Sequence, residues 1–171
     1  PVVHALRNEL AGAAVVIWTT TPWTMPGNRA IAAGPEMQYA LIHVDGVREG
    51  SLARAGEKLL VALPLLPAFI ETVGIATHHV VHLYEGRDLA GTICAHPLRG
   101  RGYDHDTPLF MADFVTAAAG TGFVHIAPGH GLDDYLLGRQ QGLPIYSPVD
   151  DDGRFCHTSD LPVAQQMPAE M

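Results

Sequence analysis

The chain has 171 residues, of which 47% are apolar and 16% are charged; this composition is typical of a folded domain and excludes a disordered segment. Its 10 basic and 18 acidic side chains give a formal net charge of −8, which argues against a protein that binds nucleic acid mainly through the phosphates. The longest apolar stretch, 59–70, is too short to cross a membrane and contains two prolines, so no membrane span is expected.

Short runs rich in β-branched residues, separated by glycine and proline, predict a series of strands. In chain order, strands are expected at 14–19, 39–44, 58–62, 79–84, 92–97, 122–126 and 144–149. Helices are expected at 64–73, where apolar residues have helical spacing after a proline, and at 132–141, which has Asp133 and Asp134 near its start and Arg139 near its end. Residues 150–153 predict a turn, and residues 160–171 are expected to be a frayed end or a linker.

These elements predict a fold class of α+β, mainly β, in which a closed or nearly closed β-barrel core of short strands has a few helices packed around it. A single domain is expected to span residues 1–171. Because the chain begins at Pro1 and not at a methionine, we expect it to be a segment of a longer protein.

Metal-binding side chains are present, but their spacing does not define a metal site. His125, His130, Asp133 and Asp134 have suitable ligand atoms, yet nothing in their spacing fixes a coordination geometry. The two cysteines form neither a disulfide framework nor a zinc motif, which favours a reducing compartment. We therefore expect no metal in the functional site and keep a metal-dependent hydrolase as an alternative.

Two segments have compositions that a hydrophobic core does not require. Residues 18–28 read Trp-Thr-Thr-Thr-Pro-Trp-Thr-Met-Pro-Gly-Asn, and hydroxyl and methyl groups held by prolines can accept a small branched aliphatic group and bind a ribose or a water. Residues 120–135 read Gly-Thr-Gly-Phe-Val-His-Ile-Ala-Pro-Gly-His-Gly-Leu-Asp-Asp-Tyr, which predicts a strand, a glycine-rich turn and an acidic helix start. Alone, each is also compatible with a structural role, as a rigid turn after a strand or as an ordinary strand-to-helix connection.

Together, these two segments resemble the editing domain (connective peptide 1) of isoleucyl-tRNA synthetase, a class I aminoacyl-tRNA synthetase. Valyl and leucyl relatives carry an arginine in the corresponding threonine-rich segment, whereas residues 19–25 contain none. The resemblance covers about 15–155, and the HIGH and KMSKS signatures of the synthetic ATP site are absent from the sequence. It implies the mainly β fold of that domain and an aminoacyl-tRNA ester hydrolase that does not itself aminoacylate tRNA.

The resemblance also implies a substrate and partners. The reaction would be hydrolysis by water of valine wrongly esterified to isoleucine tRNA, in a pocket that admits valine and excludes isoleucine by size. The implied partners are the 3′ end of that tRNA and the remainder of the synthetase, with no membrane partner, in a cytoplasmic monomer. No cofactor is expected for editing, because ATP serves only the synthetic domain. The alternatives are a valyl- or leucyl-type editing domain and a non-catalytic module that binds tRNA ends.

The resemblance assigns roles to ten residues. The implied catalytic residues are Asp134, Thr20, Thr21 and Asn28, and the implied substrate-binding residues are Trp23, Thr24, His125, Gly129, His130 and Asp133.

In these assignments, Asp134 corresponds to the acid that binds the α-ammonium group of the substrate, and Asp133 has a structural or secondary role. His125 corresponds to a histidine that lines the aliphatic pocket, whose wall also includes Thr21, Trp23 and Thr24. Thr20 and Asn28 are expected to contact the terminal ribose or to order the attacking water. The glycine content of 129–131 suggests that backbone N–H groups there stabilise the ester oxyanion.

Overall fold

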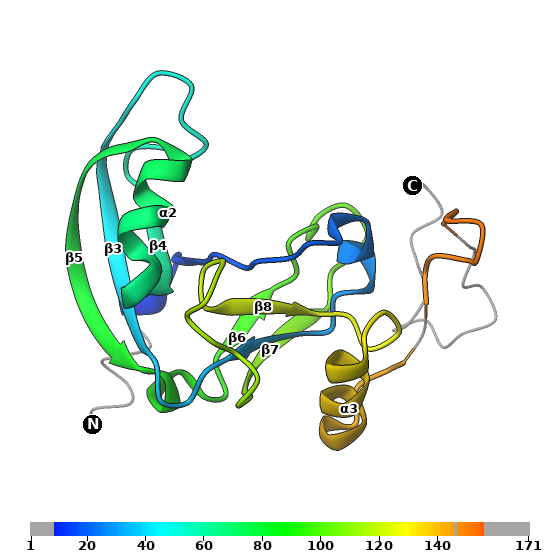
Figure 1. Cartoon of the computed structure of the whole chain (residues 1–171). Helices are drawn as coiled ribbons and strands as arrows, with labels where there is room; N and C mark the ends of the chain where they lie inside the picture. Colours follow the sequence, from blue (N-terminus) through cyan, green and yellow to red (C-terminus); the bar gives the residue numbers. More distant parts are fainter. Residues whose placement is uncertain (1–8, 146, 156–171) are drawn as a thin grey trace.

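The computed structural model describes residues 9–145 and 147–155, and these form a mainly β structure (Figure 1). The strands are β1 (Ala14–Val15), β2 (Ala30–Ala33), β3 (Gln38–Val47), β4 (Lys58–Ala62), β5 (Ile75–Glu85), β6 (Ile93–Ala95), β7 (Asp106–Met111) and β8 (Phe123–Ile126). The helices are α2 (Leu66–Val73) and α3 (Leu132–Gln141), with 3-10 turns η1 (Pro22–Gly27), η2 (Leu63–Leu65) and η3 (Gly86–Leu89). Within the described residues, no helix is long and apolar enough to cross a membrane.

The strands form two four-stranded sheets. Sheet A has the order β1-β4-β3-β5, in which β1 and β4 are parallel and β3 is antiparallel to both of its neighbours. Sheet B has the order β6-β7-β2-β8, in which β2 is parallel to β7 and antiparallel to β8. The mainly β fold class with a few helices is confirmed, but the expected closed or nearly closed barrel is wrong, because the strands divide into two open sheets. Strand patterns in the sequence could not reveal this, because alternating burial is the same in a barrel and in packed sheets.

Most predicted elements are present. Strand β4 and helix α3 have the predicted bounds, and β3 and β5 extend beyond theirs. The strand predicted at 144–149 is wrong, because Val149 makes only an isolated bridge with Phe155. The turn at 150–153 is confirmed by the hydrogen bond from the Gly153 N–H to the Asp150 carbonyl (3.0 Å). The expectation for 160–171 lies outside the described residues.

Two strands are missed by the sequence prediction. Strand β2 is rich in alanine and buried at every position, so it shows neither β propensity nor alternation. Strand β7 contains Pro108, which normally argues against an internal strand. Both strands are in sheet B, which they complete between β6 and β8.

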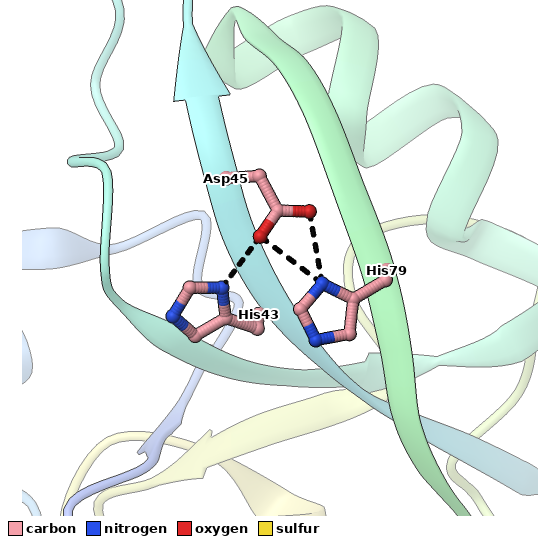
Figure 2. Close-up of side chains that lie close together, drawn as sticks. All are labelled: His43, Asp45 and His79. Carbon is pink, nitrogen blue, oxygen red and sulfur yellow. Dashed lines mark hydrogen bonds and ion pairs between the residues drawn. The ribbon is translucent and has the colours of Figure 1, made fainter.

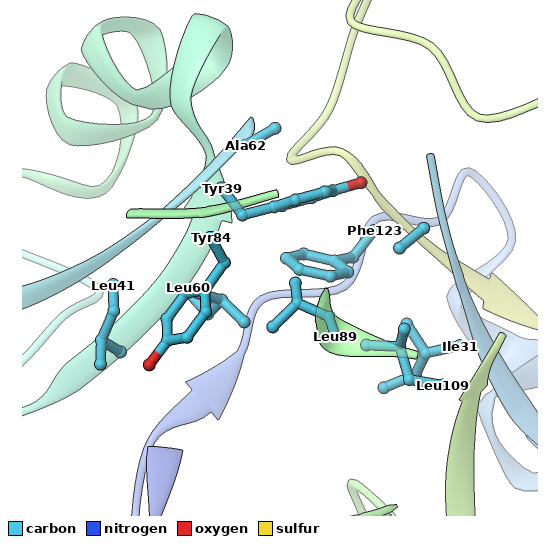
Figure 3. Close-up of a cluster of buried hydrophobic side chains, with 10 residues drawn as sticks. Ile31, Tyr39, Leu41, Leu60, Ala62, Tyr84, Leu89, Leu109 and Phe123 are labelled. Atoms are coloured by element: carbon cyan, nitrogen blue, oxygen red, sulfur yellow. The ribbon is translucent and has the colours of Figure 1, made fainter. Parts of the chain in front are cut away.

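The largest buried cluster lies between the two sheets (Figure 3) and contains residues from both of them. Its buried members are Ile31, Ala33, Tyr39, Leu41, Leu60, Ala62, Tyr84, Leu89, Leu109 and Phe123. A second cluster packs Leu66 and Phe69 of α2 against sheet A, and a third packs Leu137 of α3 against sheet B. Each helix therefore covers a face that its sheet does not share with the central core.

Tyr39 of β3 connects the two sheets through a buried hydroxyl. The hydroxyl donates to the Gly122 carbonyl and accepts the Gly34 N–H, both at 2.8 Å. Its ring lies 4.4 Å from the ring of Phe123, centroid to centroid. Burial raises the pKa of Tyr39, so the phenol remains a neutral donor at pH 7. Strand β8 is thus attached at its first residues to sheet A.

Candidate functional site

The carboxyl end of β8 is enclosed by the threonine-rich segment. Trp18 pairs with one edge of β8, where its N–H donates to the Phe123 carbonyl (2.8 Å) and its carbonyl accepts the His125 N–H (3.2 Å). On the other edge, the Arg29 N–H donates to the Ile126 carbonyl (2.9 Å), and β2 then continues the pairing. Residues 19–28 must therefore cross the end of β8 between these two attachments, which brings them to the turn that leads into α3.

His125 is the centre of a hydrogen-bonded chain of buried side chains. Its Nδ1 is 2.6 Å from Asn28 Nδ2, and its Nε2 is 3.0 Å from Thr24 Oγ1. Asn28 Nδ2 also donates to the Ala30 carbonyl (3.1 Å), which fixes the orientation of the amide. The Thr24 hydroxyl donates to the Thr21 carbonyl (2.8 Å). Thr24, Asn28 and His125 are at most 4% exposed.

These partners determine the protonation state of the imidazole. Asn28 Nδ2 is a donor, so Nδ1 of His125 accepts, and Nε2 carries the proton that it donates to Thr24. The pKa of His125 is lowered to about 4, mainly by burial and also by nearby His130. His125 is therefore neutral at pH 7, with both nitrogens engaged. This chain of hydrogen bonds holds Thr24 and Asn28 in fixed positions.

Asp134 lies in the first turn of α3, on the other side of the turn that follows β8. Its Oδ2 accepts the N–H of Ala127 (3.1 Å). Gly131 permits this approach, since a Cβ at that position would lie 3.2 Å from both Cγ and Oδ2 of Asp134. Ala127 also lies against the threonine-rich segment, since a Cβ placed on Gly27 would be 3.6 Å from the Cβ of Ala127. Ala127 therefore connects this segment to the turn before α3.

The carboxyl group of Asp134 is half-buried. Burial raises its pKa, as does the charge of Asp133, while the hydrogen bond from Ala127 lowers it. A cation placed beside this carboxylate would favour the charged form and bring the pKa down again. The arrangement therefore suits the binding of a small cationic group.

The other predicted residues are more exposed. Thr20, Trp23, Gly129 and Asp133 are at the surface, and the side chain of Trp23 is 57% exposed. His130 is half-buried, and its Nε2 is 3.4 Å from Ser147 Oγ. The structure thus joins Thr21, Thr24, Asn28 and His125 directly and places Asp134 beside the same end of β8. None of the ten assigned roles is tested by this geometry alone.

His105 supports the site and was not found from the sequence. Its Nε2 lies 3.0 Å from the backbone carbonyl of Asn28 and 2.9 Å from Arg29 Nη1, and its ring packs 4.6 Å from the ring of buried His96. Burial lowers the pKa values of both histidines, that of His96 to about 4. Nothing in the sequence near His105 signals this role, because Asn28 is 77 residues away in the chain.

A large cavity among the described residues is separate from most of these side chains. It measures about 1260 Å³, lies between the segment 10–17 and the segment 87–97, and borders Asn28 alone among the ten predicted residues. Its lining is mainly apolar. We therefore place the candidate site at the end of β8, where the polar groups converge, and not in this cavity.

Comparisons with known proteins find relatives over most of the chain. No family model matches it. It is 51% identical over 152 residues to the isoleucine–tRNA ligase of Gluconobacter oxydans, and 44% identical over 147 residues to that of Moorella thermoacetica. These matches cover 89% and 86% of the chain but only 15% and 14% of the relatives, so the chain spans about one seventh of the length of these ligases.

Solved structures show the same fold at low sequence identity. The crystal structure of GlLeuRS-CP1 matches 80% of the chain with a TM-score of 0.60 and 18% identity, over 49% of that structure. The editing domain of the P. knowlesi cytosolic leucyl-tRNA synthetase matches 79% of the chain with a TM-score of 0.60 and 14% identity, over 54% of that structure. The chain therefore belongs to the isoleucine–tRNA ligase family, as a segment that has the fold of the class I synthetase editing domain, CP1.

Proposed function

We propose that this chain hydrolyses the ester bond of valyl-tRNA(Ile) by attack of water. The observation that carries the proposal is that one end of β8 holds both groups: the half-buried Asp134 carboxylate bonds the N–H of Ala127, two residues after His125, which is hydrogen-bonded to Thr24 and Asn28. An anion next to a rigid wall of hydroxyl, methyl and imidazole groups suits an aminoacyl ester that has a cationic amine and a small aliphatic side chain.

Asp134 binds the α-ammonium group of the esterified amino acid. A charge-assisted hydrogen bond between an ammonium and a carboxylate is among the stronger polar contacts. The carboxylate keeps one oxygen on the Ala127 N–H, which fixes its orientation, and can present the other to the ligand. Asp133 is exposed and has a secondary role.

The aliphatic side chain of the substrate contacts a wall that includes Thr24 and His125, with Thr21 and Trp23 nearby. His125 holds Thr24 by a buried hydrogen bond, so the wall cannot yield easily to a larger side chain. A rigid pocket of this kind can reject isoleucine, which has one methylene more than valine, and accept valine. Size selection in this direction removes the wrong product and spares the correct one.

The attacking water is positioned by neutral groups. His125 is not the general base, because both of its nitrogens are engaged in buried hydrogen bonds and its pKa of about 4 makes it a weak base. Asn28 Oδ1 is buried and accepts no hydrogen bond from the described residues, so it can accept one from the water or from a ribose hydroxyl, as can the hydroxyl of Thr20. A free hydroxyl of the terminal ribose assists the water. Holding water and ester in a reactive geometry can supply up to about 7–11 kcal/mol.

Backbone N–H groups of the turn stabilise the oxyanion that forms on the ester. The His130 N–H is already donated to the Ala127 carbonyl (2.9 Å), which leaves the N–H groups of Gly129 and Gly131 for this role. No metal or other cofactor takes part in this scheme. The tRNA body is held by the rest of the synthetase, because the net charge of −8 opposes binding of a polyanion by this segment.

The test is deacylation of purified valyl-tRNA(Ile) and isoleucyl-tRNA(Ile) by the chain, with and without EDTA. We expect faster release of valine than of isoleucine and no effect of EDTA. Binding of the tRNA end without release of valine would instead support a non-catalytic module. Loss of activity in EDTA, restored by a metal ion, would support a metal-dependent hydrolase.

A further inference from the structure

Three side chains on sheet A, none of them part of the candidate site, converge on one point (Figure 2). His43 Nδ1 is 2.8 Å from Asp45 Oδ1, and His79 Nδ1 is 2.9 Å from Asp45 Oδ2. One ligand atom from each of the three residues can be chosen so that all lie within 4.8 Å of one another. The two imidazole rings are 5.1 Å apart, centroid to centroid, and the carboxylate bridges one nitrogen of each ring from the same side.

The backbone brings these residues together before any ligand binds. His43 of β3 is directly opposite His79 of β5 in the antiparallel register, so their side chains are on the same face. Asp45 is the extra residue of an irregularity in β3, because Val44 pairs with His78 and Gly46 pairs with Thr77. A β-bulge of this kind redirects a side chain, and here the carboxylate points between the two rings.

The donor set is typical of a transition metal site. Two imidazole nitrogens and one carboxylate oxygen are ligands that Zn²⁺ and its neighbours prefer, whereas Mg²⁺ and Ca²⁺ prefer oxygen alone. Hydrogen bonds from His79 and His43 lower the pKa of Asp45, so the carboxylate is ionised at neutral pH. The side chains of His43, Asp45 and His79 are 33%, 39% and 61% exposed, which leaves room for water as further ligands.

We propose that His43, Asp45 and His79 bind a divalent transition metal ion of the zinc class. The ion would replace the hydrogen bonds between the three side chains and link β3 to β5, an outer strand of sheet A. Small movements of these exposed side chains would be enough to admit the ion. Ligand atoms that each lie about 2.0–2.2 Å from Zn²⁺ are only slightly farther from one another than the His–Asp contacts of 2.8 and 2.9 Å are now. The candidate editing site is on sheet B, so this metal site is independent of it.

Binding should be measured by isothermal titration of the full chain with ZnCl₂, and with MgCl₂ for comparison. We expect one Zn²⁺ per chain and no detectable Mg²⁺. His79→Gln and Asp45→Asn should each weaken Zn²⁺ binding by about tenfold or more, because each removes a direct ligand. The matched control is His82→Gln, which removes a histidine of the same strand that pairs with Glu9 (3.2 Å); it should change the affinity by less than about twofold.

Lys58 provides a test in the opposite direction. It is paired with His43 across β4 and β3, so its charge opposes a bound cation, and Lys58→Gln should tighten Zn²⁺ binding by about twofold to threefold.

A measurement on the wild-type chain makes the test independent of the variants. Substoichiometric Cu²⁺ should broaden the NMR signals of His43, Asp45 and His79 before those of His82. Equal weakening of Zn²⁺ binding by His79→Gln and His82→Gln, or broadening that starts at other histidines, would overturn the proposal.

Discussion

The carboxylate of Asp134 can be tested by a substitution that removes its charge and keeps its shape. In Asp134→Asn, the amide oxygen can still accept the Ala127 N–H that the carboxylate accepts now (3.1 Å), so the turn before α3 should be retained. What the variant loses is attraction for the α-ammonium group of the substrate. The expected result is slower deacylation of valyl-tRNA(Ile) in a chain that remains folded.

The size of this effect follows from the position of the group. Opposite charges about 4 Å apart interact by about 4 kcal/mol at an effective dielectric constant of 20. Asp134 is only half-buried, so water screens part of this attraction and about 2–3 kcal/mol should remain. At about 1.4 kcal/mol per factor of ten, kcat/KM should fall by about 30- to 150-fold.

The assay is single-turnover deacylation of valyl-tRNA(Ile), with thermal unfolding followed by circular dichroism in parallel. Asp133→Asn is the control, because it removes the same charge from the next, exposed residue of the same helix; its rate should change by less than about threefold. The reasoning is refuted if Asp134→Asn deacylates as fast as the wild type, or if Asp133→Asn loses as much activity.

Three further predictions concern the site and its support. Thr24→Ser keeps the hydroxyl with its hydrogen bonds and removes one methyl, so the ratio of isoleucyl- to valyl-tRNA(Ile) deacylation should rise by about tenfold; an unchanged ratio would place the size-selecting wall elsewhere. His96 and His125 have pKa values of about 4 when folded and about 6.5 when unfolded, so the unfolded chain binds more protons between these values. Each histidine should therefore lower the free energy of unfolding by up to about 3 kcal/mol as the pH falls from about 6.5 to 4, which urea titration can measure. NMR should detect no protonation of either ring above pH 5.5. Tyr39→Phe removes the hydroxyl that bridges the sheets and should lower the unfolding free energy by about 2–4 kcal/mol, whereas Tyr135→Phe, at an exposed position, should change it by less than about 0.5 kcal/mol.

Local signals in the sequence were sufficient to predict the bounds of an element whose ends are marked by charged residues and glycine. Helix α3 begins with aspartates and ends before Gly142, which has a φ of 66°, and its bounds were predicted correctly. Strand β2 has no such signal: four buried residues, three of them alanine, become a central strand only because β7 and β8 pair with both sides. Tertiary pairing decided this element, and no local pattern could have predicted it.

The candidate site likewise has one part that the sequence predicted and one part that it could not predict. The residue types of the threonine-rich segment and of the turn before α3 suggested a pocket, and the resemblance placed them in one site. The hydrogen bond from His125 to Thr24 spans 101 residues of sequence, and neither periodicity nor spacing predicts such a contact. The same holds for His43, Asp45 and His79, which share a face only because β3 and β5 pair in one register with an irregularity at Asp45.

The path of the chain from β1 to β2 has a mechanical consequence. The chain leaves sheet A after Val16, whose N–H donates to the Leu60 carbonyl (3.2 Å), and joins sheet B at Trp18. Only Ile17 separates these two anchors, so the threonine-rich segment begins at a taut crossing between the sheets. Trp18 and Arg29 attach both ends of this segment to β8, and Asp134 is attached to the end of the same strand through Ala127, so both halves of the site move with sheet B. The crossing at Ile17 takes up a rotation of sheet A against sheet B before it reaches the site, and the distance between the two halves of the site is set within sheet B.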